Sequence, residues 1–152
     1  MRIMVLGADG YIGWPLVQHL LAQGHEVRAV DSCVKRRWER AYGGTPVLPL
    51  PSFMARARAL ENPKLRAFQL DMQPQERELY ELLDETMPGT IVHLAEQPSA
   101  PLSMLNRRAG LMTVGNNVMG TMNLIFAVGH LARKFSYMPH IIKLGSMGEY
   151  GT

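Results

Sequence analysis

Cysteine is almost absent from this sequence. Cys33 is the only cysteine among 152 residues, so no disulfide can form within the chain, and a small scaffold held together by disulfides is excluded. Nothing in the composition calls for an oxidising compartment. We therefore expect a protein of the reducing cytoplasm.

Long apolar runs are also missing. No stretch approaches the ~18 consecutive apolar residues that a membrane span requires. The apolar run at residues 2–6 is shorter than the apolar region of a signal peptide, and it leads directly into a glycine turn. We expect neither export nor a membrane partner.

Neither sign of charge dominates the chain. The 16 Lys and Arg and the 13 Asp and Glu leave a net charge of +3, and no long run carries one sign, which argues against a nucleic-acid partner. The densest basic cluster, residues 35–40, fits a solvated loop as well as it fits a phosphate contact. The five histidines show no metal-ligand spacing, so we expect no metal site.

What the sequence does contain is an alternation of apolar strands and helical segments. Hydrophobic residues make up 47% of the chain, enough to bury the core of one domain over residues 1–152. The predicted strands are residues 2–6, 26–31, 65–71, 90–95 and 140–146; the predicted helices are residues 11–23, 52–62, 74–87 and 104–135, with a loop over 32–51. This alternation predicts an α/β fold, a doubly wound parallel sheet of the Rossmann type that is cut after its fifth strand.

A glycine turn links the first predicted strand to the first predicted helix. Gly7 permits the tight turn, Gly10 lets backbone N–H groups approach a pyrophosphate, and Gly13 lets the helix pack closely on the strand. Asp31 ends the second strand, where its carboxylate would accept hydrogen bonds from an adenosine ribose and would repel a 2′-phosphate. The pattern predicts NAD rather than NADP, although the basic residues 35–37 are close enough to neutralise a phosphate. Asp31 as a simple turn cap stays an alternative.

Asp71 occupies the corresponding place after the third strand. Its carboxylate could receive the amino group of an adenine, and an ordinary turn residue before Pro74 would look the same. Both interpretations stay open at this point.

The turn and the long helix together resemble one enzyme family. The spacing G-x-x-G-x-x-G around "GYIG", and the stretch "NNVMGT" beginning at Asn116, resemble the extended short-chain dehydrogenase/reductase family, which modifies nucleotide sugars. In that family one of the two asparagines touches the cofactor and the other braces the site; two surface amides are the alternative. The resemblance implies that NAD is bound by Gly7, Asp9, Gly10, Tyr11, Ile12, Gly13, Asp31, Arg36, Asp71, Met72, Leu94 and Asn116.

The same resemblance assigns a catalytic hydroxyl. The family carries a Ser or Thr four residues before a Tyr-Gly pair at the end of the fifth strand, and Ser146 stands in that relation to Tyr150 and Gly151. Its implied role is to hydrogen-bond the reacting sugar hydroxyl. The family's Tyr-x-x-x-Lys does not occur after Ser146, so the chain resembles the NAD-binding first part of a longer enzyme.

Two segments narrow the resemblance to one branch of the family. Residues 93–104 and 143–152 resemble the branch that forms a sulfonated sugar from UDP-glucose and sulfite, with Ser146 where that branch typically has Thr. This implies a UDP-sugar and sulfite as partners, and a homodimer when the protein is complete. Glu96, Gln97 and Ser99 are predicted to contact the sugar or sulfite, or else to form a Pro-braced loop. The other possibilities are an epimerase or dehydratase for another nucleotide sugar, and an NAD-binding module without catalysis.

Overall fold

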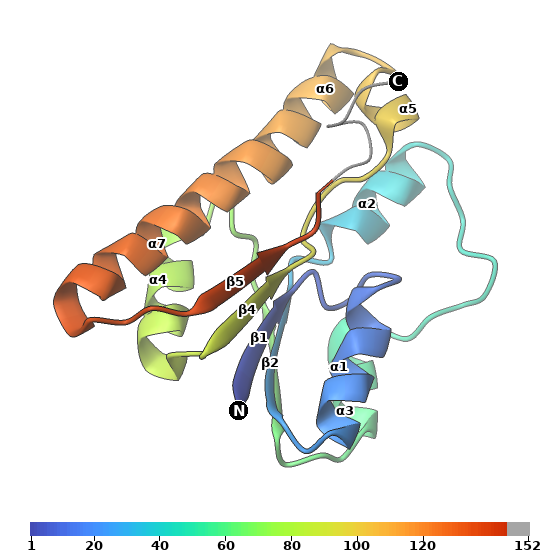
Figure 1. Cartoon of the computed structure of the whole chain (residues 1–152). Coiled ribbons are helices and arrows are strands. Elements are labelled where there is room, and N and C mark those ends of the chain that lie inside the picture. The colour runs from blue at the N-terminus through green and yellow to red at the C-terminus, as the bar shows by residue number, and fades with distance from the viewer. Residues whose placement is uncertain (146–152) are drawn as a thin grey trace.

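The structure, a computed structural model, describes residues 1–145 and shows a parallel five-stranded sheet (Figure 1). The strand order is β3-β2-β1-β4-β5, and every neighbouring pair is parallel. The strands are β1 Arg2–Leu6, β2 Glu26–Asp31, β3 Leu65–Gln69, β4 Thr90–His93 and β5 His140–Lys143. The predicted doubly wound sheet is confirmed. Its order reverses between β1 and β4, the point at which such sheets bind ligands.

Helices cover both faces of the sheet. They are α1 Gly13–Ala22, α2 Val34–Ala41, α3 Phe53–Ala59, α4 Glu76–Thr86, α5 Ala100–Ser103, α6 Arg107–Val114 and α7 Gly120–Phe135, with a π-helical segment, η1 Gly115–Met119, between the last two. One core joins α1 and α3 to the sheet through Val17 and Phe53. The other core joins α4 and α7 through Leu83 and Leu124. Burial on both faces explains why the central strands are apolar throughout.

The prediction of a continuous loop over residues 32–51 is wrong in its first part, where α2 forms. This helix buries none of its residues, so it shows no apolar periodicity that could have revealed it. Lys35 pairs with Glu39 one turn later, at 3.7 Å, and Arg36 ties the helix to the glycine turn through its ion pair with Asp9 at 2.5 Å. The helix begins after Cys33, whose φ of 55° is left-handed.

The predicted helix over residues 104–135 is interrupted at both its start and its middle. Asn106 caps a new start, because its side chain accepts a hydrogen bond from the backbone N–H of Ala109. The residues Asn116 and Asn117 then lie in the π-helical segment. Segments of this kind frequently mark functional sites.

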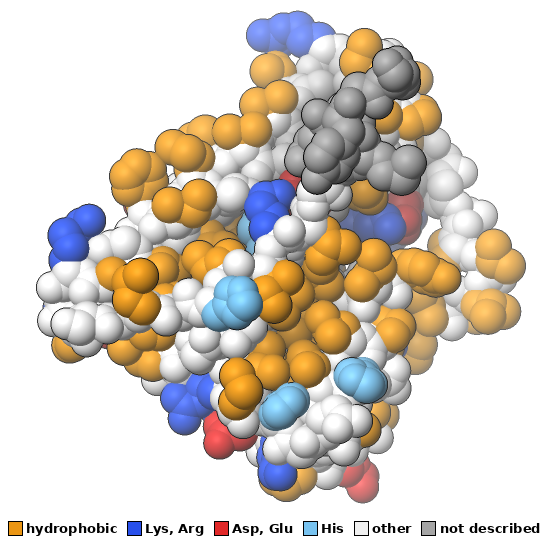
Figure 2. All heavy atoms as spheres, in the orientation of Figure 1, with side chains coloured by type: hydrophobic (Ala, Val, Ile, Leu, Met, Phe, Trp, Pro, Cys, Tyr) orange, Lys and Arg blue, Asp and Glu red, His pale blue; other side chains and the backbone are white. Residues whose placement is uncertain are grey.

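The long helix that runs from Arg107 to Phe135 has an apolar side that the described residues leave uncovered. It is long and apolar enough to cross a membrane by length and composition, with a mean hydropathy of 1.2 over its best window, of which 22% is buried. The sequence analysis expected no such segment. In the structure this helix lies against α4 and belongs to one layer of the fold, and Figure 2 shows hydrophobic side chains gathered along it. Exposed members include Leu111, Val114, Val118, Met122, Ile125 and Phe126.

Candidate functional site

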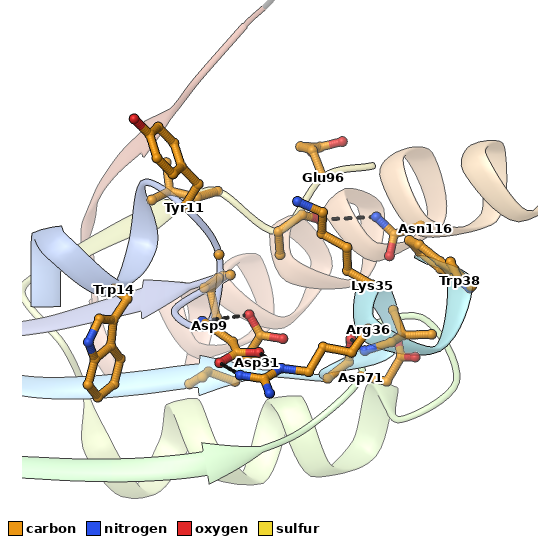
Figure 3. Close-up of a pocket in the computed structure, with 18 of the residues that line it drawn as sticks. Asp9, Tyr11, Trp14, Asp31, Lys35, Arg36, Trp38, Asp71, Glu96 and Asn116 are labelled. Atoms are coloured by element: carbon orange, nitrogen blue, oxygen red, sulfur yellow. Dashed lines mark hydrogen bonds and ion pairs between the residues drawn. The ribbon is translucent and has the colours of Figure 1, made fainter. Parts of the chain in front are cut away.

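A cavity of about 570 Å³ opens at the carboxyl ends of the strands, beside the point where the sheet order reverses. It is lined by the glycine turn, the residues that follow β2, β3 and β4, and parts of α2 and η1 (Figure 3). The predicted site residues that line it are Gly7, Asp9, Gly10, Tyr11, Asp31, Arg36, Asp71, Met72, Leu94, Glu96 and Asn116. Ile12, Gly13, Gln97 and Ser99 are not among its lining residues.

The glycine turn is shaped by close backbone contacts. Gly7 has a φ of +86°, and a Cβ there would lie 2.6 Å from the carbonyl carbon of Leu94. A Cβ on Gly13 would lie 2.0 Å from the carbonyl oxygen of Gly7, so this glycine serves the packing of α1 rather than the cavity. Gly10 differs, because a Cβ added there would meet only the carbonyl oxygen of Gly7, at 3.3 Å. The turn therefore keeps one open side, at the N-terminus of α1.

Tyr11 and Ile12 stand at the rim of the turn. The side chain of Tyr11 is 92% exposed and points away from the acidic and basic residues deeper in the site (Figure 3). Ile12 precedes α1 and is also exposed. Their predicted contacts with a cofactor stay predictions.

Asp31 is held in place by two backbone donors. Its Oδ2 accepts a hydrogen bond from the N–H of Asp9 at 2.8 Å, and its Oδ1 accepts one from the N–H of Cys33 at 2.7 Å. Burial raises the pKa of Asp31, and these two hydrogen bonds oppose that effect. The turn-capping interpretation is thus realised, yet the carboxylate also lines the cavity and each oxygen keeps a lone pair for a further donor.

Asp9 lies between two arginines. Arg36 donates from Nε to Asp9 Oδ2 at 2.5 Å and from Nη2 to Asp9 Oδ1 at 2.8 Å. Arg56 donates from Nη2 to the same Oδ1, and also to the backbone oxygen of Asp9 at 3.1 Å. Arg56 also stacks over the ring of Trp14, 4.3 Å from its centroid. The sequence analysis found Arg36 but missed Arg56, because Arg56 lies in a short helix 25 residues after Asp31 and no spacing links it to the turn.

Asp71 and Met72 follow β3 on the far side of the cavity. The Oδ1 of Asp71 accepts a hydrogen bond from the N–H of Gln73 at 3.1 Å, as a turn residue would. The side chain of Met72 is buried and would contact a Cβ added to Gly120. Both residues line the cavity, so the adenine contact proposed for Asp71 is compatible with its role in the turn.

The two asparagines of η1 are not surface amides. The Nδ2 of Asn116 donates to the carbonyl of Ala95 at 3.1 Å (Figure 3). The side chain of Asn117 binds the backbone of Gln97 twice: its Oδ1 accepts from the N–H at 2.8 Å, and its Nδ2 donates to the carbonyl at 3.1 Å. Asn116 lines the cavity, whereas Asn117 fastens the loop after β4 to the helix. Asn117 thus braces the loop, and the contact of Asn116 with the cofactor stays a prediction.

The three residues predicted to contact substrate have different surroundings. Glu96 lines the cavity and pairs with Lys143 of β5 at 2.7 Å. Gln97 is 6% exposed, and its amide binds Thr113 Oγ1 and the backbone of Ser99, whose hydroxyl caps α5. Within residues 1–145, the side chains of Gln97 and Ser99 brace the loop.

Lys143 and His93 contact Glu96 without lining the cavity, and the sequence analysis did not single them out. The parallel register places Lys143 beside His93. The charge of Lys143 in an otherwise apolar strand was the feature of the sequence that could have drawn attention to it. Burial, followed by the charge of Lys143, lowers the pKa of His93 to about 4. His93 is therefore neutral at pH 7, and its contact with Glu96 at 3.5 Å is no ion pair there.

The neutral ring of His93 has a defined tautomer. Its Nδ1 accepts from the N–H of Ala95 at 3.3 Å, and the Oγ1 of Thr121 donates to the carbonyl of Asn117 at 2.6 Å. The proton therefore sits on Nε2, which donates to Thr121 Oγ1 at 3.0 Å. This histidine is a packed core residue.

Two further predictions concern metals and the catalytic hydroxyl. Potential ligand atoms of Asp9, Asp31 and Cys33 lie within 4.8 Å of one another, but every carboxylate oxygen of this group accepts a hydrogen bond from the protein. Ser146, with Tyr150 and Gly151, lies outside the described residues, so its catalytic role stays a prediction.

The sheet order, the glycine turn and the carboxylate after β2 define a dinucleotide-binding domain of the Rossmann type. The sequence profile of the "NAD dependent epimerase/dehydratase family" matches residues 3–152, and the chain belongs to this family. The prediction that the cofactor is NAD is confirmed at the level of the family.

Two curated relatives carry the same name. The chain is 39% identical over 155 residues to the chloroplastic UDP-sulfoquinovose synthase of Spinacia oleracea, covering 99% of the chain and 31% of that protein. It is 37% identical over 156 residues to the UDP-sulfoquinovose synthase of Sulfolobus acidocaldarius, covering 100% of the chain and 38% of that protein. The chain thus spans about a third of the length of these relatives.

Solved structures of similar fold include sugar-nucleotide enzymes. The UDP-Glc/GlcNAc 4-epimerase of Campylobacter jejuni has a TM-score of 0.72 at 22% identity, covering 99% of this chain and 38% of that one. The Bordetella bronchiseptica enzyme WbmG, solved in complex with NAD, has a TM-score of 0.65 at 24% identity, covering 99% of this chain and 39% of that one. At this identity these structures support the fold alone.

Proposed function

We propose that this chain is the NAD-binding part of a nucleotide-sugar-modifying enzyme, a UDP-sulfoquinovose synthase that converts UDP-glucose and sulfite to UDP-sulfoquinovose. The observation that carries this proposal is the match to two relatives of that name, from a plant and an archaeon, over at least 99% of the chain. A UDP-sugar and sulfite are then the partners. A homodimer and a cytoplasmic location belong to the same proposal, although one relative is named as chloroplastic.

The residues of the cavity fit NAD. A Cβ at Gly10 would meet only the carbonyl oxygen of Gly7, so a diphosphate could lie on this side of the turn, against the N-terminus of α1, where the helix dipole favours negative charge. Asp31 would accept from the adenosine ribose, Asp71 and Met72 would flank the adenine, and Asn116 and Leu94 would line the path toward the nicotinamide. When bound, NAD would supply reversible hydride transfer with the sugar.

The loop after β4 provides the substrate side of this proposal. Glu96 is the predicted substrate residue that both lines the cavity and carries a charge, and Lys143 holds its carboxylate in position. Asn117 and Gln97 keep the same loop fixed to η1. A fixed loop reduces the reorganisation needed when a substrate binds.

The test is an assay of the protein expressed from its complete gene with UDP-glucose, NAD and sulfite, with the products identified by mass spectrometry. We expect a UDP-linked sulfonated sugar whose formation stops when sulfite is omitted. Conversion of UDP-glucose to an isomer at the same rate with and without sulfite would instead identify an epimerase.

A further inference from the structure

The cluster of Asp9, Arg36 and Arg56 is a charged group to which the proposed hydride transfer assigns no role, although the resemblance places Asp9 and Arg36 next to NAD. The side chain of Asp9 is 7% exposed, that of Arg56 13% and that of Arg36 25%. All three line the cavity together with Asp31, and Figure 3 shows Asp9, Asp31 and Arg36 side by side. The N–H of Asp9 donates to Asp31 at 2.8 Å, so the cluster adjoins the place where an adenosine ribose would bind.

Two guanidinium groups facing one point are the usual means of binding a phosphate. In this chain the point between them is occupied by the Asp9 carboxylate, which binds Arg36 through both oxygens and Arg56 through one. Together with Asp31 the four side chains have no net charge. Without Asp9 they would carry one positive charge next to the ribose.

The arginines are arranged to keep this geometry when the carboxylate is removed. Arg36 donates from Nη1 to the carbonyl of Pro51 at 3.0 Å, which keeps its Nε and Nη2 edge directed at Asp9. Arg56 is held by its stacking on Trp14. Its Nε is buried and has no hydrogen-bond partner among residues 1–145, which is unusual for an arginine that serves stability alone.

From this geometry we infer that Asp9 is a specificity-determining residue, which excludes NADP by occupying the two arginines that would otherwise bind a 2′-phosphate. Asp31 repels that phosphate directly, and Asp9 removes its counter-charges. The inference rests on the proposed function only in requiring that the chain binds NAD. It also explains why Asp31, a carboxylate typical of NAD sites, lies close to basic side chains that could otherwise bind a phosphate.

The first test compares NAD and NADP binding to the complete protein and to its Asp9→Asn variant by calorimetry. Asparagine keeps the shape of the side chain and removes one negative charge. We expect the affinity for NADP relative to NAD to rise by at least about tenfold, because a full charge changes beside a partly buried phosphate. The rise should shrink at high salt and should be lost in the double variant Asp9→Asn, Arg36→Met. An unchanged ratio overturns the inference.

A matched control removes the same charge elsewhere. Glu85 pairs with Arg66 at 3.0 Å on an exposed surface and does not line the cavity. Glu85→Gln should therefore leave the ratio of the two affinities unchanged. An equal rise in this variant would reduce the effect to overall net charge and would also overturn the inference.

A second variant covers the case in which Asp9→Asn does not fold. Asp9→Ser removes the same negative charge with a smaller side chain, so adenosine 2′,5′-bisphosphate should compete better against bound NAD than it does in the unchanged protein. Equal or weaker competition overturns the inference. If the unchanged protein binds neither dinucleotide, the proposed function itself fails; if it binds NAD and only the ratios fail to respond, the role of Asp9 alone is rejected.

Discussion

At the scale of single residues, the site is built from side chains that have structural partners as well as a place in the cavity. Asp31 and Asp71 each accept hydrogen bonds from backbone groups of their own turns. Asn116 is bound to the loop after β4. Interactions of this kind lock the rotamers of a binding site before the ligand arrives, which lowers the cost of binding.

His93 should make the stability of the protein fall in mild acid. Its pKa is lowered from 6.5 to about 4 by burial and then by Lys143, so the unfolded chain binds a proton more readily than the folded protein does. The stability that depends on a neutral His93 is fully present above about pH 6.5 and is lost as the pH falls from there through 4. The loss amounts to about 3 kcal/mol in the free energy of unfolding. Urea unfolding at a series of pH values measures it.

The matched variant for this prediction is His93→Gln, which keeps a polar side chain near Thr121 and cannot titrate. We expect it to be less stable than the unchanged protein at pH 7 but to have a flatter stability profile between pH 6.5 and pH 4. A profile of the same slope would assign the acid sensitivity to other groups.

Ser146 should carry part of the chemistry. In the complete enzyme, Ser146→Ala should lower kcat by about a hundredfold, because a hydroxyl that hydrogen-bonds the reacting group is removed. Affinity for NAD should change little in a calorimetric titration. Ser146→Thr, which retains a hydroxyl, is the control and should keep most of the activity; full activity in the alanine variant would contradict the assignment.

At the scale of elements, the turn between β1 and α1 contains one glycine that close packing requires, Gly13, and one that is predicted to contact NAD, Gly10. Gly13→Ala should destabilise the protein by about 3 kcal/mol, because its Cβ would lie 2.0 Å from a backbone oxygen that cannot move without displacing β1. Thermal unfolding measures this loss.

Gly10→Ala is the comparison, with its nearest contact at 3.3 Å. It should fold with little loss of stability and should lower the affinity for NAD by about tenfold, because the methyl group holds the diphosphate away from the backbone. Equal stability losses in the two variants would show that both glycines serve packing.

The sequence predicted most elements where apolar periodicity was strong and failed where it was weak. The five strands follow from short apolar runs between turns, since both faces of the sheet are buried. The helix α2 was missed because it buries nothing. The sequence analysis predicted one continuous helix over residues 104–135 and missed the π-helical segment within it, because such a segment depends on tertiary contacts such as those of Asn117 with Gln97.

At the scale of the whole molecule, NAD should stabilise the fold because its predicted contacts come from both halves of the sheet. The cavity joins the turn after β1, the residues after β2 and β3, and the loop after β4. At a concentration one hundred times its Kd, NAD should raise the free energy of unfolding by about 2.7 kcal/mol. Urea unfolding with and without NAD measures this, and the same concentration of NADP should have a smaller effect. Equal stabilisation by both dinucleotides would contradict the predicted selectivity.

The kind of fold, the glycine turn and the carboxylate after the second strand can be predicted from the sequence, because they depend on local spacing and on the order of elements along the chain. Which side chains meet depends on how those elements pack in three dimensions. Arg56 reaches Asp9 across 47 residues, and Lys143 reaches Glu96 across 47 residues. Glu96 and Lys143 meet because the carboxyl ends of parallel strands gather at one edge of the sheet, and Arg56 reaches the glycine turn from α3. No local pattern records which charges will neutralise each other there.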